Sequence, residues 1–284
     1  MAHICILTDS TAQMPSQSFV GHELVKVIPM HILMNCKLHV DSKDLKLSSL
    51  PTSTHNRLIP KVLPPSPDDF REKYIHLTHK YNEIVVILIS SHLSSAVTHA
   101  LVAAETYNGA ASIHVIDSQN AAVGLGLLVQ VAAEAAHNGY SSIEISRLIR
   151  GLVPRVYTVF CLQSLTYLYH SGHLDPAQAI IGEMLGVTPF FILENGRLVP
   201  VQKIRNSRHL VDLLNEFVSE FTDLKHIAVL HGLPPFEQEV RSLRERINGN
   251  FPIATYSEHT LGTPLAAILG PRCLGVVAME NTLA

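Results

Sequence analysis

The 284-residue sequence predicts an α/β protein, with an N-terminal parallel α/β/α sandwich and a C-terminal α+β domain whose sheet is mainly antiparallel. Three observations lead to this prediction. The length suits two domains of ordinary size, apolar strand-like runs alternate with helical segments in the first part, and a hairpin signal lies in the later part. We expect the domains to cover 1–154 and 155–284, with the boundary near Pro154.

Apolar runs in the first part predict buried strands over 4–7, 83–89 and 112–116. Helical sequence follows over 95–107, 121–137 and 142–152. Strands that are apolar on both faces and alternate with helices predict a parallel sheet covered by helices. Each of the three runs ends in hydroxyl or carboxylate residues. Ligands of open parallel sheets bind outside the carboxyl ends of the strands, so this edge is the first indication of a site.

Between 37 and 69 the regular pattern gives way to Ser, Thr, Pro and Lys, with a turn-rich run at 63–67. Loops of this length are either functional or disordered, and we favour a functional loop.

The later part of the chain has a different pattern. A strand is predicted over 156–162, and two more, over 187–193 and 198–204, flank the hairpin turn signal Glu-Asn-Gly-Arg. The other expected elements are helices over 209–221 and 236–247 and strands over 227–230, 253–256 and 273–279. Hairpins mixed with helices predict an α+β domain.

The composition excludes several classes of protein. The net charge is −3 and no run of Lys and Arg is present, so we expect no nucleic acid partner. No apolar stretch approaches the roughly 18–20 residues of a membrane helix, and the N-terminus does not resemble a signal peptide. We therefore expect a cytoplasmic protein without stable membrane insertion. The four cysteines form no C-x-x-C and the 17 histidines no H-E-x-x-H, so we expect neither a metal nor another cofactor.

Six segments, in order along the whole chain, resemble motifs of the DegV family. Thr-Asp-Ser-Thr at 8–11 resembles the family's opening T-D-S-T, and Ser-Ser-His-Leu-Ser at 90–94 resembles its S-S-x-L-S-G-T. The other segments are Asp117-Ser118 with Gly124 to Leu128, 165–172 before the family's G-G-R-I, Asn195-Gly196 through Arg205, and Gly270-Pro271 through Gly275.

The resemblance implies a long-chain fatty acid buried between the two domains. The family includes the binding subunit of bacterial fatty acid kinase, in which a separate kinase subunit phosphorylates the exposed carboxylate. We accordingly expect a bacterial, non-catalytic lipid-binding protein that has a fatty acid as its ligand and a fatty acid kinase subunit as its partner.

Ser94 is the main candidate for the carboxylate site, because it stands just before the predicted helix and can be its N-cap. A helix N-terminus supplies free N–H groups and a partial positive charge, and Ser91 and Ser95 add hydroxyl donors. A cap and turn role alone would also explain this serine cluster. Arg205 is either an exposed rim charge or a residue that faces the carboxylate and the kinase partner.

Two departures from the family pattern affect the head-group site. The family's long loop carries T-S-Q-P-S-P, whose Thr contacts the carboxylate, but Val62 stands here and cannot donate a hydrogen bond. A gapless match places Ile268 at the position of a family His, and His259 would need an insertion to align. Either Ser94, Ser95 and backbone N–H groups hold the carboxylate, or His259 occupies the same space, or the ligand is a less polar lipid.

Two alternatives stay open. Asp9, Ser94 and His259 can be written as a hydrolase or phosphotransfer set, although no G-x-S-x-G elbow accompanies Ser94. A binding or regulatory module with an altered head-group site is the other alternative. The Gly124 and Gly126 pair indicates close helix packing instead of a phosphate loop.

Overall fold

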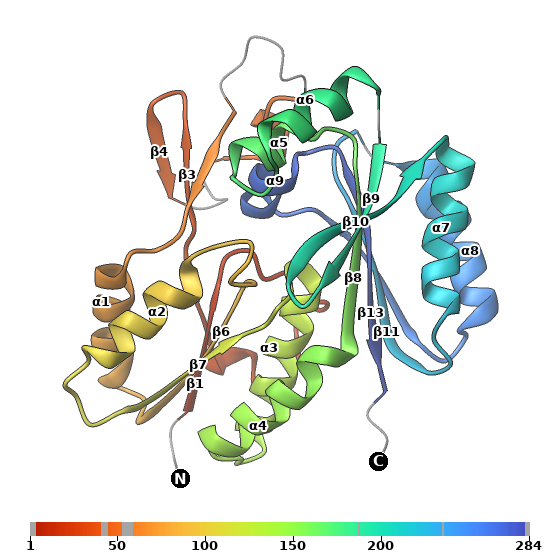
Figure 1. Ribbon diagram of the computed structural model, residues 1–284. Helices are drawn as coiled ribbons and strands as arrows, with labels where there is room; N and C mark the ends of the chain where they lie inside the picture. Colours follow the sequence, from red (N-terminus) through yellow and green to blue (C-terminus); the bar gives the residue numbers. More distant parts are fainter. Residues whose placement is uncertain (1–3, 41–44, 53–58, 187, 235, 282–284) are drawn as a thin grey trace.

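The structure, a computed structural model, describes residues 4–40, 45–52, 59–186, 188–234 and 236–281. Five layers follow one another across the molecule: helices α1 and α2, sheet A, helices α3 and α4, sheet C, and helices α7 and α8 (Figure 1). A small sheet B lies at one end of these layers. The predicted fold class is confirmed, since a parallel sheet is followed by a mainly antiparallel one.

Sheet A contains four parallel strands in the order β2 (Val25–Ile28), β1 (Ile4–Asp9), β6 (Glu83–Leu88) and β7 (Ser112–Asp117). The central strands β1 and β6 are buried on both faces, which explains their continuous apolar runs. The two faces are covered by α1 (Pro67–Thr78) with α2 (Ala96–Glu105), and by α3 (Ala122–His137) with α4 (Ser142–Leu152).

Helix α3 lies between the two large sheets and contacts β1 and β6 on one side and β8 and β13 on the other. It is therefore apolar around most of its circumference, and residues from Ala122 to Val129 are all buried.

Sheet C has the order β10 (Arg197–Ile204), β9 (Thr188–Glu194), β8 (Val156–Leu162), β13 (Cys273–Glu280), β11 (Leu224–His231) and β12 (Thr255–Thr260). All neighbours are antiparallel except β11 and β12. Helices α7 (Ser207–Ser219) and α8 (Glu237–Asn250) cover its outer face. Every strand of sheet A precedes Pro154 and every strand of sheet C follows it, and a domain boundary there remains our proposal.

The excursion over 37–69 is not wholly a loop, which corrects the sequence interpretation. Sheet B contains β4 (Lys37–Val40), β3 (His31–Met34) and β5 (Lys61–Leu63), all antiparallel. Asn35 and Cys36, both with positive φ, form the turn between β3 and β4. Segments 41–44 and 53–58 of the excursion, and Val187 of a predicted strand, lie outside the described residues.

Sheet B packs against the later part of the chain. Helix α9 (Thr263–Leu269) contacts β5, β3 and α5 (Thr166–His170), and α6 (Pro176–Met184) follows α5. The described residues also include three short 3-10 helices: η1 (His22–Leu24), η2 (Leu47–Ser49) and η3 (Val153–Arg155).

Two apolar clusters form the core. One extends from sheet A through α3 to the inner face of sheet C and to α9, and includes Ile6, Leu125, Phe160 and Leu265. The other lies between the outer face of sheet C and α7 and α8. In the described part of the chain, no helix is both long and apolar enough to cross a bilayer. No group of three or more His, Cys, Asp or Glu side chains there could hold a metal ion.

Candidate functional site

A cavity of about 620 Å³ opens beside the carboxyl end of β6, between elements from both parts of the chain. Four segments line it: 61–64 around β5, 91–95 with His99 at the start of α2, 170–173 at the end of α5, and Ile268 in α9. This volume is within the range of about 300–1,000 Å³ that is usual for small-molecule sites. We refer to it as the β5–α2 cavity.

The serine loop of this cavity is fixed by the backbone around Ser90. The Ser90 N–H donates to the Asn120 carbonyl at 2.9 Å, and the N–H groups of Leu93 and Ser94 donate to the Ser90 carbonyl at 2.9 and 3.1 Å. The chain therefore turns tightly between β6 and α2. Ser91, Ser94 and Ser95 all line the cavity as a result.

The expectation that Ser94 is the helix N-cap is wrong by one position. Ser95 is the N-cap residue of α2, without a side-chain cap bond, and the Ser94 hydroxyl oxygen accepts from the Ala96 N–H at 3.3 Å. In that bond the Ser94 hydroxyl is the acceptor and uses only an oxygen lone pair. Its hydrogen is therefore still able to donate to a ligand.

Histidines supply most of the other polar lining. His99 Nδ1 lies 2.7 Å from the Pro65 carbonyl oxygen. A carbonyl only accepts, so Nδ1 carries the hydrogen and Nε2 of the neutral ring keeps a free lone pair. His170 and His173 line the cavity from the end of α5. Burial lowers the pKa of His173, and a backbone hydrogen bond with Leu93 partly opposes this effect.

The described lining contains a cationic side chain, Lys61, and no anionic one, while His99 presents a lone pair from its neutral ring and burial lowers the pKa of His173. His92 and His170 also line the cavity. Such a cavity favours an anionic group over a cationic one.

Val62 and Ile268, which both depart from the family pattern, line this cavity. Val62 is fixed by its pairing with Ile32 in sheet B, and Ile268 is 2% exposed within α9. Two apolar side chains therefore lie in the same cavity as the three serines.

Arg205 and His259 are not among the described residues that line this cavity. Arg205 is exposed just after β10, and its backbone N–H donates to His209 Nδ1 at 3.2 Å. His259 lies on the edge strand β12, where its Nε2 is 2.9 Å from Ser257 Oγ. No described bond links either residue to Ser94.

Asp9 has a structural role at the carboxyl edge of sheet A. Its carboxylate accepts from the Thr11 N–H at 2.9 Å, from the Thr11 hydroxyl, and from the Ile89 N–H at 2.7 Å. Burial raises the pKa of this carboxyl, and these hydrogen bonds act in the opposite direction. Its oxygens are thus used to tie β1 to β6, and the set Asp9, Ser94 and His259 is not assembled.

Asn120 joins the two large sheets. Its amide nitrogen donates to the Val156 carbonyl at 2.9 Å, and its amide oxygen accepts from Thr158 Oγ1 at 2.7 Å. A Cβ on Gly124 would lie 2.0 Å from that amide oxygen, and one on Gly126 would lie 2.0 Å from the Gln13 carbonyl oxygen. The two glycines thus serve close helix packing, as the sequence indicated.

The tip of the β9–β10 hairpin rests on the serine loop. Ser90 Oγ donates to the Gly196 carbonyl at 2.7 Å, and Arg197 Nε donates to His92 Nε2 at 3.2 Å. Asn195 and Gly196 both have positive φ, which confirms the predicted hairpin turn. The hairpin therefore supports the cavity lining from the side of sheet C.

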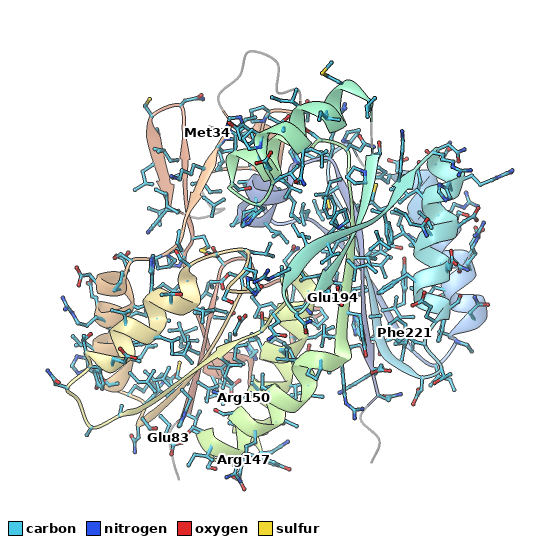
Figure 2. All side chains as sticks on the ribbon, in the orientation of Figure 1. Met34, Glu83, Arg147, Arg150, Glu194 and Phe221 are labelled. Carbon is cyan, nitrogen blue, oxygen red and sulfur yellow. The ribbon has the colours of Figure 1, made fainter. Side chains whose placement is uncertain are left out.

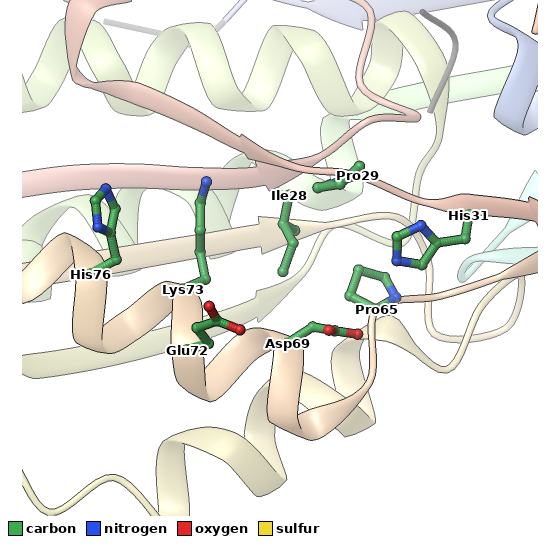
Figure 3. A pocket seen from close by; sticks show the side chains of 8 residues that line it. All are labelled: Ile28, Pro29, His31, Pro65, Asp69, Glu72, Lys73 and His76. Atoms are coloured by element: carbon green, nitrogen blue, oxygen red, sulfur yellow. The ribbon is translucent and has the colours of Figure 1, made fainter. Parts of the chain in front are cut away.

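A neighbouring pocket of about 300 Å³ lies between α1 and the link from β2 to β3 (Figure 3). Its lining includes Asp69, Glu72 and Lys73, and Asp69 is held in the capping box of Ser66. Two carboxylates in its wall disfavour a free anion, so the β5–α2 cavity is the better anion site.

Sequence interpretation missed Lys61, His99 and His170 as lining residues. His99 stands one helical turn after Ser95, on the same face of α2, and this spacing was an available signal. His170 and Lys61 are brought in by α5 and β5, whose positions in space no local pattern reveals.

Comparison with known proteins identifies the family. The family described as "Uncharacterised protein, DegV family" matches residues 3–281. A DegV domain-containing protein of Caldanaerobacter subterraneus is 26% identical over 285 residues, which cover 99% of this chain and 100% of that protein.

Solved structures have the same fold. A fatty-acid-binding DegV family protein from Thermus thermophilus superposes with a TM-score of 0.85 at 24% identity, covering 98% of this chain and 100% of that one. The fatty acid kinase B3 protein of Streptococcus pneumoniae, loaded with linoleic acid, gives a TM-score of 0.84 at 21% identity over 98% and 100% of the two chains. With the family profile spanning almost every residue, this chain belongs to the DegV family.

Proposed function

We propose that this protein binds a long-chain fatty acid in the β5–α2 cavity, between domains 1–154 and 155–284, and presents its carboxylate to a separate kinase subunit. The observation that carries the proposal is the joint lining of one cavity by Ser91, Ser94 and Ser95 and by apolar Val62 and Ile268. The Thermus relative binds a fatty acid, and the Streptococcus relative belongs to a fatty acid kinase.

The acyl chain supplies the free energy of binding. Burial gains roughly 0.8 kcal/mol per methylene, so a chain of about 16 carbons offers around 10 kcal/mol before costs. The charged head group must be paired or hydrogen-bonded in return. The free hydroxyl hydrogen of Ser94, the hydroxyls of Ser91 and Ser95 and the ammonium group of Lys61 are the proposed partners. His170, which also lines the cavity, is a further proposed partner, whereas the neutral ring of His99 offers the cavity a lone pair and no donor for a carboxylate.

The protein itself performs no reaction in this proposal, and a partner kinase phosphorylates the carboxylate in the bacterial cytoplasm. The exposed guanidinium of Arg205 is a proposed contact for that kinase. A hydrolase is disfavoured because Asp9 and His259 are hydrogen-bonded elsewhere.

Organic extraction of the purified protein followed by mass spectrometry tests the proposal. We expect one co-purified acyl chain per protein, and saturable binding of palmitate to delipidated protein in titration calorimetry. An empty protein that does not bind palmitate contradicts the proposal, and turnover of p-nitrophenyl esters would support the enzyme instead.

A further inference from the structure

A second pocket, of about 400 Å³, lies beside the β9–β10 hairpin and shares no lining residue with the β5–α2 cavity. Its walls come from η3, the start of β8 and the hairpin itself. We call it the hairpin pocket. Glu194, one of its lining residues, is labelled in Figure 2 near the middle of the molecule, where the hairpin approaches the first half of the chain.

The body of the hairpin pocket is apolar. Val199 of β10 pairs with Ile192 of β9, and Ile192 pairs with Val159 of β8, so one apolar row crosses these strands. Val153 of η3 and Val156 at the start of β8 also line the pocket. Its volume and apolar lining suit a compact small molecule.

The charge of the hairpin pocket is opposite to that of the β5–α2 cavity. Glu194 is the only charged side chain among its described lining residues, next to the neutral side chains of Gln119, Asn195 and Tyr157. Arg197 lies opposite the exposed Glu194 across the hairpin, but its guanidinium donates to His92 and is not part of the described lining. Within the pocket an anion would therefore face Glu194, whereas an amine would gain a partner. A fatty acid therefore does not suit this pocket.

Both walls of the hairpin pocket are hydrogen-bonded to the serine loop. Gly196 accepts from Ser90 Oγ at 2.7 Å, and a Cβ on Gly196 would lie only 2.4 Å from that oxygen. On the opposite wall, one carboxylate oxygen of Asp117 accepts from the N–H groups of Gln119 at 2.8 Å and Ser91 at 3.2 Å. A change in either wall is thus transmitted to Ser90 and Ser91 through direct bonds.

We propose that the hairpin pocket is a second ligand site, for a compact apolar amine, and that its occupancy changes the affinity of the β5–α2 cavity for its lipid. The coupling part rests on the proposed lipid-binding function, and the existence of the second site does not. By linkage, the lipid changes the affinity for the amine by the same factor.

The site is tested with cyclohexylamine and cyclohexanecarboxylate, which share a ring and differ in charge. Methyl NMR of the full chain should show saturable shifts of the Ile192 and Val199 signals with the amine and none with the carboxylate. Val199→Trp fills the pocket and should abolish the shifts, whereas Gln202→Trp, on the same strand outside the pocket, should retain them. If Val199→Trp does not fold, Val201→Trp at the half-exposed rim replaces it.

Absence of saturation, equal shifts with the carboxylate, or shifts that persist in the filled variant would each overturn the site.

The coupling is tested by titrating palmitate with and without saturating cyclohexylamine. We expect the Kd of palmitate to change about fivefold or more. An unchanged palmitate Kd rejects the coupling. A protein that does not bind palmitate at all rejects the proposed function together with the coupling, while the NMR result still decides the site.

Discussion

Two groups of polar residues follow the strands of sheet A, and they differ in how much of their hydrogen-bonding capacity the fold itself uses. The buried polar set is Asp9, Thr11, Ser118 and Asn120, together with Thr158 of β8, which bonds to Asn120 from sheet C; it is at most 2% exposed and bonded internally. The cavity serines Ser91, Ser94 and Ser95 face open space instead. A polar residue at the carboxyl end of a strand is therefore a binding candidate only when the fold has left its donors unused.

The largest expected effect is on stability, from Asn120→Ala in the buried polar set. The change removes three side-chain hydrogen bonds, with Val156, Thr158 and Ala121. Each buried group left unpaired costs about 1–3 kcal/mol, so the free energy of unfolding should fall by about 3 kcal/mol or more. Urea denaturation measures this loss. Ser95→Ala is the control and should stay within about 0.5 kcal/mol. A similar loss for both variants would remove the distinction between the two groups.

His226 extends the comparison to pH, because its ring is 7% exposed and bonded within the fold, with Nε2 2.8 Å from Ser257 Oγ. Burial, aided by the charges of His259 and Lys225, lowers the pKa of His226 from 6.5 to about 4. Between pH 6.5 and 4 the unfolded chain therefore binds more protons at His226 than the folded protein does. The contribution of the neutral, buried His226 ring to the free energy of unfolding is complete above pH 6.5 and is lost as the pH falls towards 4. The loss is up to about 3 kcal/mol.

Urea unfolding of the wild type and His226→Gln at pH 7 and pH 4.5 checks this sign. The wild type should lose more free energy of unfolding than the variant over this interval. A parallel loss in both proteins would show that other groups control the acid sensitivity.

Replacement by alanine should change the stability of the protein in opposite directions at two helical glycines. Gly126→Ala places a Cβ against the Gln13 carbonyl and should cost about 1–3 kcal/mol. Gly151→Ala in α4 meets nothing within 4 Å and should gain up to about 1 kcal/mol from helix propensity. Thermal denaturation of both variants measures the difference, and a destabilised Gly151→Ala would contradict it.

The cavity serines should affect binding and leave stability unchanged. A hydroxyl bonded to a charged group contributes about 1.5–3 kcal/mol, so Ser94→Ala should weaken palmitate binding roughly tenfold or more. Val62→Thr adds a donor in the same cavity and should tighten binding. Titration calorimetry of both variants measures the Kd of palmitate, and Ser219→Ala, at an exposed position, is the control. Unchanged affinity in both would place the head group elsewhere.

Much of the fold could be predicted because its central strands and helices carry strong periodic signals. The expected strand over 156–162 matches β8 at both ends, and the helix over 142–152 matches α4. Helix α9 was missed because it is short and buried on all sides, a pattern that resembles a strand. Helix α1 was missed although Ser66, Pro67 and Asp69 form a capping box with proline in the first turn.

The candidate site was only partly predictable. Ser91, Ser94, Ser95, Val62 and Ile268, which the family resemblance named, line one cavity, and their contact with a ligand stays a prediction. The histidines at 99, 170 and 173 join them because the start of α2 and the end of α5 border the same cavity, although they are about 70 positions apart in the sequence. Whether Arg205 contacts a kinase stays a prediction.

The position of β13 has a consequence for how the chain acquires its structure during synthesis. This strand is the last of the described strands, yet it lies in the interior of sheet C, hydrogen-bonded to β8 on one side and β11 on the other. A ribosome that has made 260 residues has therefore produced β8 and β11 without the strand that joins them, and α3 lacks its contacts with β13. Sheet A can form early, but the second half must wait for residues 273–280 to leave the exit tunnel.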